Sequence, residues 1–173
     1  MQAELQELLV EQLKDAYSAE KQALRCMQRT VTKATSPKLK DAIEAHIEET
    51  MGQIERVEEA LGTLEAKPGR KVCLAMRGLV EEAVEEMGDH KKGPVLDLVI
   101  VAGMQRIEHY EIAAYGTSAA LAKALGSSKA AKLLETTLAE EKAADGKLTE
   151  VTQAEVMPSA LAEGKDQRSA MRR

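Results

Sequence analysis

The stretch AYSAEKQALRCMQRTVTKATSPKLKDAIEAHIEETMGQI, residues 16–54, decides the fold. Apolar residues recur three and four positions apart on both sides of its centre, which is the spacing of one face of an amphipathic helix. Thr35-Ser36-Pro37 interrupts this pattern, because the serine is a good N-cap and the proline a good first helical residue. The segment predicts two helices, about residues 3–34 and 37–66, joined by a turn short enough to make an antiparallel hairpin.

The rest of the chain has a similar organisation. Residues 68–93 differ in sequence pattern from the long helical segments and are expected to contain one short amphipathic helix, around residues 72–87. Two more long helices are expected at about 94–125 and 128–157, separated by Gly126-Ser127-Ser128 and ended by Pro158. Two hairpins joined by a long crossover are one wiring of a four-helix bundle. We therefore predict an all-α four-helix bundle over residues 1–157, whose crossover contains a short fifth helix.

The segment after Pro158 consists mainly of small and polar residues and has a net positive charge. Such a composition is typical of a disordered end, so residues 158–173 are predicted to be a disordered tail. A partner-binding arm is the alternative.

Each long helix carries a carboxylate near its middle, on the stripe that ought to be apolar. These residues are Glu20, Glu49, Glu108 and Glu141. The offsets between corresponding positions in the two halves are 88 and 92 residues, which suggests an internal duplication. Further ligand-type side chains share these faces, one turn away along the helix: His46, Gln53, Glu111 and Asp145.

Carboxylates that converge in a core repel each other and lose hydration, and only protonation, cationic partners or a metal can offset that cost. Oxygen donors with an occasional imidazole suit iron or manganese, and two ions can share bridging carboxylates in a site built by four helices. The ligand types leave zinc and magnesium open. We predict that this set of eight side chains binds metal, and a solvated or salt-bridged interior is the alternative. For His46 taken alone, the alternatives are a ligand, a partner of a ligand, or a polar residue at the edge of the stripe.

Composition and charge exclude several classes of protein. Phe and Trp are absent and charged residues make up 31% of the chain, which is typical of helical proteins. The net charge of −5 is spread over both signs, so neither a nucleic-acid nor a membrane partner is expected. The first residues lack the features of a signal peptide, and the longest apolar run, residues 94–104, is too short to span a bilayer. We expect a cytoplasmic protein.

Two cysteines, Cys26 and Cys73, lie in separate segments without a CxxC motif. We interpret both as buried thiols in a reducing compartment, with a disulfide or redox pair as the alternative. Tyr17 and Tyr115 lie near Glu20 and Glu108 along their helices, where they can fill the core or donate hydrogen bonds to carboxylates. His109 points away from Glu108, which favours a structural or interface role.

Four segments carry a family resemblance: KDAYSAEKQ (14–22), HIEET (46–50), RIEHYEIAAYGT (106–117) and EEKAAD (140–145). They resemble the signature segments of the YciE/YciF family of ferritin-like stress proteins, over roughly residues 5–155. The resemblance implies a ferritin-like bundle, a homodimer, a di-iron site and a link to bacterial stress responses.

One family feature is missing from both halves of the chain. Gly52 and Ala144 stand where the histidine of a ferritin-like Glu-x-x-His pair would be, and Gln53 and Asp145 follow one residue later. Such an oxygen-rich, histidine-poor site favours weaker or more manganese-like binding.

Two functions are compatible with this sequence. The first is an intracellular di-iron or di-manganese protein that reacts with oxygen or peroxide, as a ferroxidase or a peroxide scavenger. The second is a non-catalytic helical interaction protein with weak or no metal binding. The sequence leaves open whether the chain is an enzyme.

Overall fold

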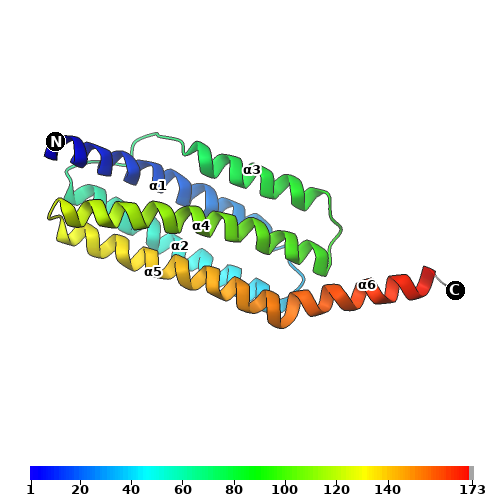
Figure 1. Cartoon of the computed structure of the whole chain (residues 1–173). Helices are drawn as coiled ribbons and strands as arrows, with labels where there is room; N and C mark the ends of the chain where they lie inside the picture. Colours follow the sequence, from blue (N-terminus) through cyan, green and yellow to red (C-terminus); the bar gives the residue numbers. More distant parts are fainter. Residues whose placement is uncertain (172–173) are drawn as a thin grey trace.

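The computed structural model describes residues 1–171, and the surroundings of side chains up to Gly164. Four long helices pack side by side: α1 (Gln2–Thr30), α2 (Pro37–Thr63), α4 (Pro94–Ala124) and α5 (Ser128–Val151). A shorter helix, α3 (Leu74–Gly88), lies along the outside of α1 and α4 (Figure 1). This is the predicted all-α, ferritin-like bundle, in which the crossover from α2 to α4 carries the fifth helix.

The turn between α1 and α2 is fixed by two polar side chains. Ser36 caps α2 as predicted, since its hydroxyl accepts a hydrogen bond from the Leu39 N–H at 3.1 Å. Asp97, near the start of α4, accepts bonds from the Thr35 N–H at 2.7 Å, the Thr35 hydroxyl at 2.5 Å and the Ser36 N–H at 2.8 Å. The first turn of α4 therefore holds the predicted hairpin closed.

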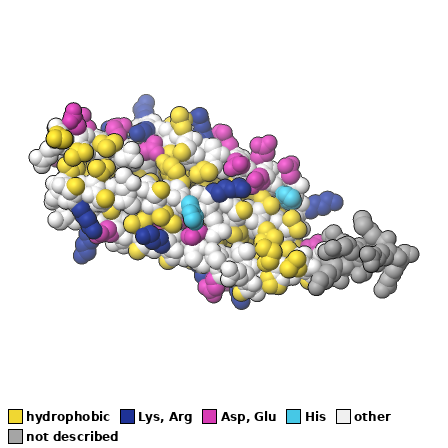
Figure 2. Space-filling view, viewed as in Figure 1, with side chains coloured by type: hydrophobic (Ala, Val, Ile, Leu, Met, Phe, Trp, Pro, Cys, Tyr) yellow, Lys and Arg dark blue, Asp and Glu magenta, His cyan; other side chains and the backbone are white. Residues whose placement is uncertain are grey.

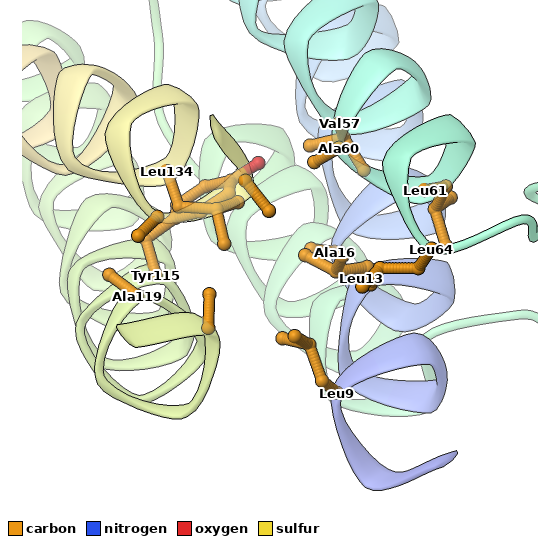
Figure 3. Packing of buried hydrophobic residues seen from close by; sticks show 13 residues of the cluster. Leu9, Leu13, Ala16, Val57, Ala60, Leu61, Leu64, Tyr115, Ala119 and Leu134 are labelled. Carbon is orange, nitrogen blue, oxygen red and sulfur yellow. The ribbon is translucent and has the colours of Figure 1, made fainter. Parts of the chain in front are cut away.

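The apolar core is divided into two main clusters along the bundle. One end is built around Leu9, Leu13, Val57, Leu61, Tyr115 and Leu134 (Figure 3). The other end is built around Met27, Ile43, Ile100, Met104 and Leu148. Each large apolar side chain buried here contributes about 1.5–3 kcal/mol. The acidic residues singled out in the sequence lie on the same helices between these two clusters.

Close packing holds α3 against the bundle. A Cβ atom at Gly103 would come within 2.9 Å of the Ala83 side chain, so α4 and α3 can approach this closely only because position 103 is glycine. Cys73 caps α3 with its sulfur, and its thiol lies 3.0 Å from the Tyr110 hydroxyl. Both Cys73 and Cys26 are buried and free, as predicted for structural thiols.

The C-terminal segment departs from the prediction. The last long helix does not end at Pro158: it widens into a π-helical turn, Thr152–Val156, and continues as α6 (Met157–Met171). A π turn contains one extra residue, which relieves the clash that a proline ring otherwise makes with the preceding turn. Figure 1 shows α6 projecting beyond the bundle. The division into a bundle and a tail at residue 157 stays a prediction, and Arg172 and Arg173 lie outside the described residues.

Charges of both signs are interspersed on the face shown in Figure 2. Within residues 1–171, no helix combines the length and the apolar character that crossing a membrane requires.

Candidate metal centre

The middle layer of the bundle is lined by buried polar side chains from all four long helices. Each one interrupts a stripe of apolar residues, so the amphipathic pattern that forms the helix also turns the side chain inward. No more than 4% of any of these residues is exposed: Glu20 on α1, His46 and Gln53 on α2, Glu108 and Glu111 on α4, and Glu141 on α5.

Four of these side chains form a compact group. One ligand-type atom from each of His46, Glu108, Glu111 and Glu141 lies within 4.8 Å of the corresponding atoms of the others. Oxygen and nitrogen ligands bind first-row metals at roughly 2.0–2.2 Å, so two ligands of one ion lie up to about 4.4 Å apart. The group is therefore compact enough for small side-chain movements to close it around a cation.

His46 is surrounded by carboxylates on both sides of its ring. Its Nδ1 lies 3.1 Å from Glu49 Oε2, and its Nε2 lies 3.1 Å from Glu108 Oε2 and 3.5 Å from Glu141 Oε2. The contact with Glu108 is close but poorly aligned for a hydrogen bond, so it acts as an electrostatic attraction. Burial alone would lower the pKa of His46, but Glu108 and Glu49 outweigh this effect and raise it to about 9.

The carboxylates of the group have too few partners. Neither oxygen of Glu141 accepts a hydrogen bond, and one oxygen each of Glu20 and Glu111 is also without a donor among the described residues. Burial raises the pKa of Glu111 and Glu141 well above the ordinary value, and the neighbouring carboxylates raise both further. Burial likewise raises the pKa of Glu20 to about 7, although the hydrogen bond from Tyr115 opposes the shift. Buried acidic oxygens that lack donors fit a cation, because a bound metal would supply the missing positive partner.

Glu20 lies at the edge of the group of four. The Tyr115 hydroxyl donates a 2.5 Å hydrogen bond to Glu20 Oε1, which fixes the orientation of the carboxylate. The sequence placed both residues near the centre. It left two roles open for Tyr115, filling the core or donating a hydrogen bond to a carboxylate. In the structure Tyr115 does both.

Two of the predicted ligands, Glu49 and Asp145, are not part of the buried layer. The inward positions of α2 are residues 46, 50 and 53, so the Glu49 side chain stays at the helix edge and is 44% exposed. It accepts a hydrogen bond from His46 Nδ1, as the outer carboxylate of a metal-bound histidine commonly does. A groove of about 560 Å³ between α2 and α5 reaches His46 and Glu49 from the surface. A direct role of Glu49 as a metal ligand stays a prediction.

Asp145 is the second outlying residue. It accepts a 2.9 Å hydrogen bond from Gln105 Nε2, and its carboxylate lies 3.3 Å from His109 Nε2. Asp145 is therefore part of a surface contact between α4 and α5. His109 is 68% exposed, in agreement with the prediction that it points away from the core.

Residues around Gln53 form a polar network that the sequence analysis missed. Gln53 Nε2 donates to Glu140 Oε2 at 3.1 Å, and Arg56 pairs with the same carboxylate and donates to Thr137 Oγ1 at 3.0 Å. The sequence held one signal for this network: Arg56 lies one turn after Gln53 on the same helix. Its partner on α5 is visible only in the folded structure.

Comparison with known proteins places the chain in a family. The model of the family described as "Domain of unknown function (DUF892)" matches residues 4–161. The chain belongs to the DUF892 family. Protein YciF of Escherichia coli (strain K12) is 46% identical over 148 residues, which cover 85% of this chain and 89% of YciF. The predicted resemblance to the YciE/YciF proteins is confirmed.

Three solved structures share the fold of this chain. The crystal structure of the E. coli stress protein YciF matches with a TM-score of 0.81 and 46% identity, covering 85% of this chain and 93% of that one. YcfI from Rhodopseudomonas palustris matches with a TM-score of 0.81 and 41% identity, covering 84% and 92%. A ferritin-like, diiron-carboxylate protein from Bacillus anthracis has a TM-score of 0.66 at 16% identity, covering 85% and 96%, and supports the ferritin-like fold alone.

Proposed function

We propose that this DUF892 protein binds iron or manganese in its bundle core and reacts there with a small oxidant, oxygen or peroxide. The observation that carries the proposal is the buried group of His46, Glu108, Glu111 and Glu141, in which both oxygens of Glu141 lack a hydrogen-bond donor. Two bound ferrous ions would supply the two electrons that, with two protons from solvent, reduce hydrogen peroxide to two molecules of water.

The protein's own side chains have separate roles in this proposal. Glu108, Glu111, Glu141 and His46 hold the cation, while Glu49 orients the imidazole from outside the group. Because metal binding requires deprotonated ligands, the cation competes with the protons that the raised pKa values of Glu111 and Glu141 favour. The groove beside His46 is a route from the surface for a small oxidant.

Ferrous oxidation tests the proposal. Aerobic addition of Fe²⁺ to metal-free protein should oxidise the iron faster than buffer alone. It should also be faster than with a Glu20→Ala/Glu108→Ala variant, which lacks two buried carboxylates. Equal rates in all three samples would overturn the proposed oxidation. Elemental analysis of protein purified without added metal identifies the resident ion.

A non-catalytic interaction protein is the second candidate. It is favoured by the raised pKa values of Glu111 and Glu141, because protonated carboxyl groups can remain buried without a metal. Melting temperature separates the two functions, since a metal that binds only the folded state must raise it. An unchanged melting temperature with Fe²⁺ and with Mn²⁺ would favour the second candidate.

The cellular setting belongs to the same proposal. YciF is described as a stress protein, and we propose a stress-related role in the cytoplasm for this chain, as a homodimer without nucleic-acid or membrane partners. Light scattering coupled to gel filtration tests the dimer: a mass of about 19 kDa would indicate a monomer, because one chain has a mass of 18.8 kDa.

A further inference from the structure

A network of four side chains joins α2 to α5 beside the candidate metal centre. Arg56 pairs with Glu140 and donates a 3.0 Å hydrogen bond to Thr137 Oγ1. Glu140 accepts a second bond, 3.1 Å long, from Gln53 Nε2. We call Arg56, Glu140 and Gln53 the amide clamp.

The clamp determines which way the Gln53 amide faces. A carboxylate only accepts hydrogen bonds, so the NH₂ group of Gln53 must be the part that faces Glu140. The amide oxygen, Oε1, is then turned away from Glu140. Gln53 is fully buried and Oε1 has no donor among the described residues. A buried acceptor without a donor destabilises the fold, and a nearby cation would offset that cost.

Glu20 and Gln53 lie on the two antiparallel arms of one hairpin, α1 and α2. Burial raises the pKa of Glu20 and the charge of Arg56 opposes that shift, so the clamp lies within electrostatic reach of Glu20. His46 lies two helical turns from Gln53, roughly 10 Å along α2. Glu20 also has an unpartnered oxygen, Oε2. Gln53 Oε1 and Glu20 Oε2 are therefore two buried oxygens without donors on neighbouring helices.

We propose that the amide clamp fixes Gln53 as a neutral oxygen ligand next to Glu20, and that it sets the preference of the centre for Mn²⁺ or Fe²⁺ over Zn²⁺. Carboxylate and carbonyl oxygens suit manganese, whereas an imidazole suits zinc. Arg56 and Glu140 are positioning residues in this scheme, because they act through Gln53. The inference rests on the metal binding in the proposed function and does not depend on the reaction with oxidants.

Gly52 contributes to the same arrangement. A Cβ atom at this position would lie 3.5 Å from a terminal nitrogen of Arg56, so the guanidinium folds back over the glycine. A histidine at position 52 would extend beyond Cβ toward the space that the guanidinium occupies. Gly52, which stands where the histidine of a Glu-x-x-His pair would be, thus leaves space for the Arg56 side chain of the clamp.

Competition between Mn²⁺ and Zn²⁺ on the full chain tests the clamp. Both affinities are measured by calorimetry for the wild type, Gln53→His, Glu140→Ala and Arg56→Lys. We expect Gln53→His to raise the ratio of zinc to manganese affinity by roughly tenfold or more. Glu140→Ala frees the amide to rotate and should weaken manganese binding by roughly tenfold, with a smaller loss for zinc. Arg56→Lys keeps the charge without the guanidinium fork and should fall between Glu140→Ala and the wild type.

Glu59→Gln is the matched control. Glu59 pairs with Lys129 at 2.7 Å and also joins α2 to α5, but both side chains are exposed. This variant should leave both affinities unchanged. Circular dichroism and metal-free melting curves establish that each variant folds.

The ratio of the two affinities distinguishes the clamp from a purely structural role, which would weaken both metals alike. An unchanged ratio in Gln53→His and Glu140→Ala, with metal still bound, would overturn the clamp and leave the proposed function standing. A wild type that binds neither metal would overturn both proposals. Normal metal binding with no iron oxidation would overturn only the proposed oxidation.

Discussion

Two buried carboxylates of this protein, Asp97 and Glu141, are almost equally shielded from water but have opposite surroundings. Asp97 accepts hydrogen bonds from three donors of Thr35 and Ser36. Glu141 accepts none, and its neighbours include Glu108 and Glu111. The first carboxylate closes a turn and the second lies in a group of like charges. Burial alone therefore does not distinguish these two acids, whereas the number of hydrogen-bond donors around each one does.

The same comparison explains how the fold tolerates the acidic centre. Apolar clusters lie at both ends of the bundle and Asp97 ties the turn at one end, so the helices are held together outside the polar layer. The centre can then keep side chains whose pairing is incomplete. Each of the following predictions tests one side of this contrast.

Removal of Asp97 should have the largest effect on stability. Asp97→Ala leaves two backbone N–H groups and the Thr35 hydroxyl without their acceptor, which should lower the free energy of unfolding by about 3 kcal/mol. Urea denaturation of the metal-free protein measures the change. Thr35→Val, which removes one of the three donors, should cost about 1 kcal/mol. A loss below 1 kcal/mol for Asp97→Ala would show that the turn does not depend on this carboxylate.

Replacement of Glu141 should affect metal binding and spare the fold. Glu141→Leu removes a buried carboxyl group that has no hydrogen-bond donor, so the metal-free stability should stay unchanged or rise by about 1 kcal/mol. Mn²⁺ at a hundredfold excess over its Kd should stabilise the wild type by about 2.7 kcal/mol and leave the variant unaffected. A variant that is strongly destabilised without metal would contradict the contrast with Asp97.

Stability of the metal-free protein should fall as the pH rises. Burial raises the pKa of Glu20 from 4.5 to about 7, and the adjacent carboxylates raise the pKa of His46 from 6.5 to about 9 against the effect of burial. Both groups hold their protons to higher pH in the folded chain than in the unfolded one. The folded state therefore loses stability between pH 4.5 and 9.

Urea denaturation with a chelator present measures this dependence. We expect the free energy of unfolding to be lower at pH 8.5 than at pH 5.5, by on the order of 2 kcal/mol for each of these two groups. With Mn²⁺ added the trend should weaken or reverse, because the metal displaces the same protons. A metal-free stability that rises over this range would contradict the assigned protonation.

The smallest effect is expected for the outer carboxylate. Glu49→Gln replaces the charged acceptor of His46 Nδ1 by a neutral one, which should weaken Mn²⁺ binding by roughly tenfold. The neighbouring exposed residue provides a control, and Glu48→Gln should leave the affinity unchanged. Equal affinities for Glu49→Gln and the wild type would show that the imidazole is oriented without Glu49.

Much of the architecture could be predicted because it depends on local spacing. The recurrence of apolar residues and the Ser36-Pro37 signal predicted the long helices and the first hairpin, and both are present. The same periodicity correctly predicted that Glu20, Glu108 and Glu141 point into the core. The periodicity could not decide whether Glu49 or Thr50 points into the core, because the two residues lie 100° apart at the border of the buried face of their helix. Pro158 gave the wrong end for the last helix, because a π turn can accommodate proline.

The sequence by itself determined the helical class, the hairpin order and the acidic character of the core, because propensity, capping and periodicity act between residues a few positions apart. Only the tertiary structure decided how the carboxylates are partnered. Asp97 meets its donors across more than 60 residues of chain, and Gln53 meets Glu140 across 87. The hydrogen bonds that distinguish a structural acid from a candidate metal ligand form between helices, and their geometry exists only after the bundle has packed.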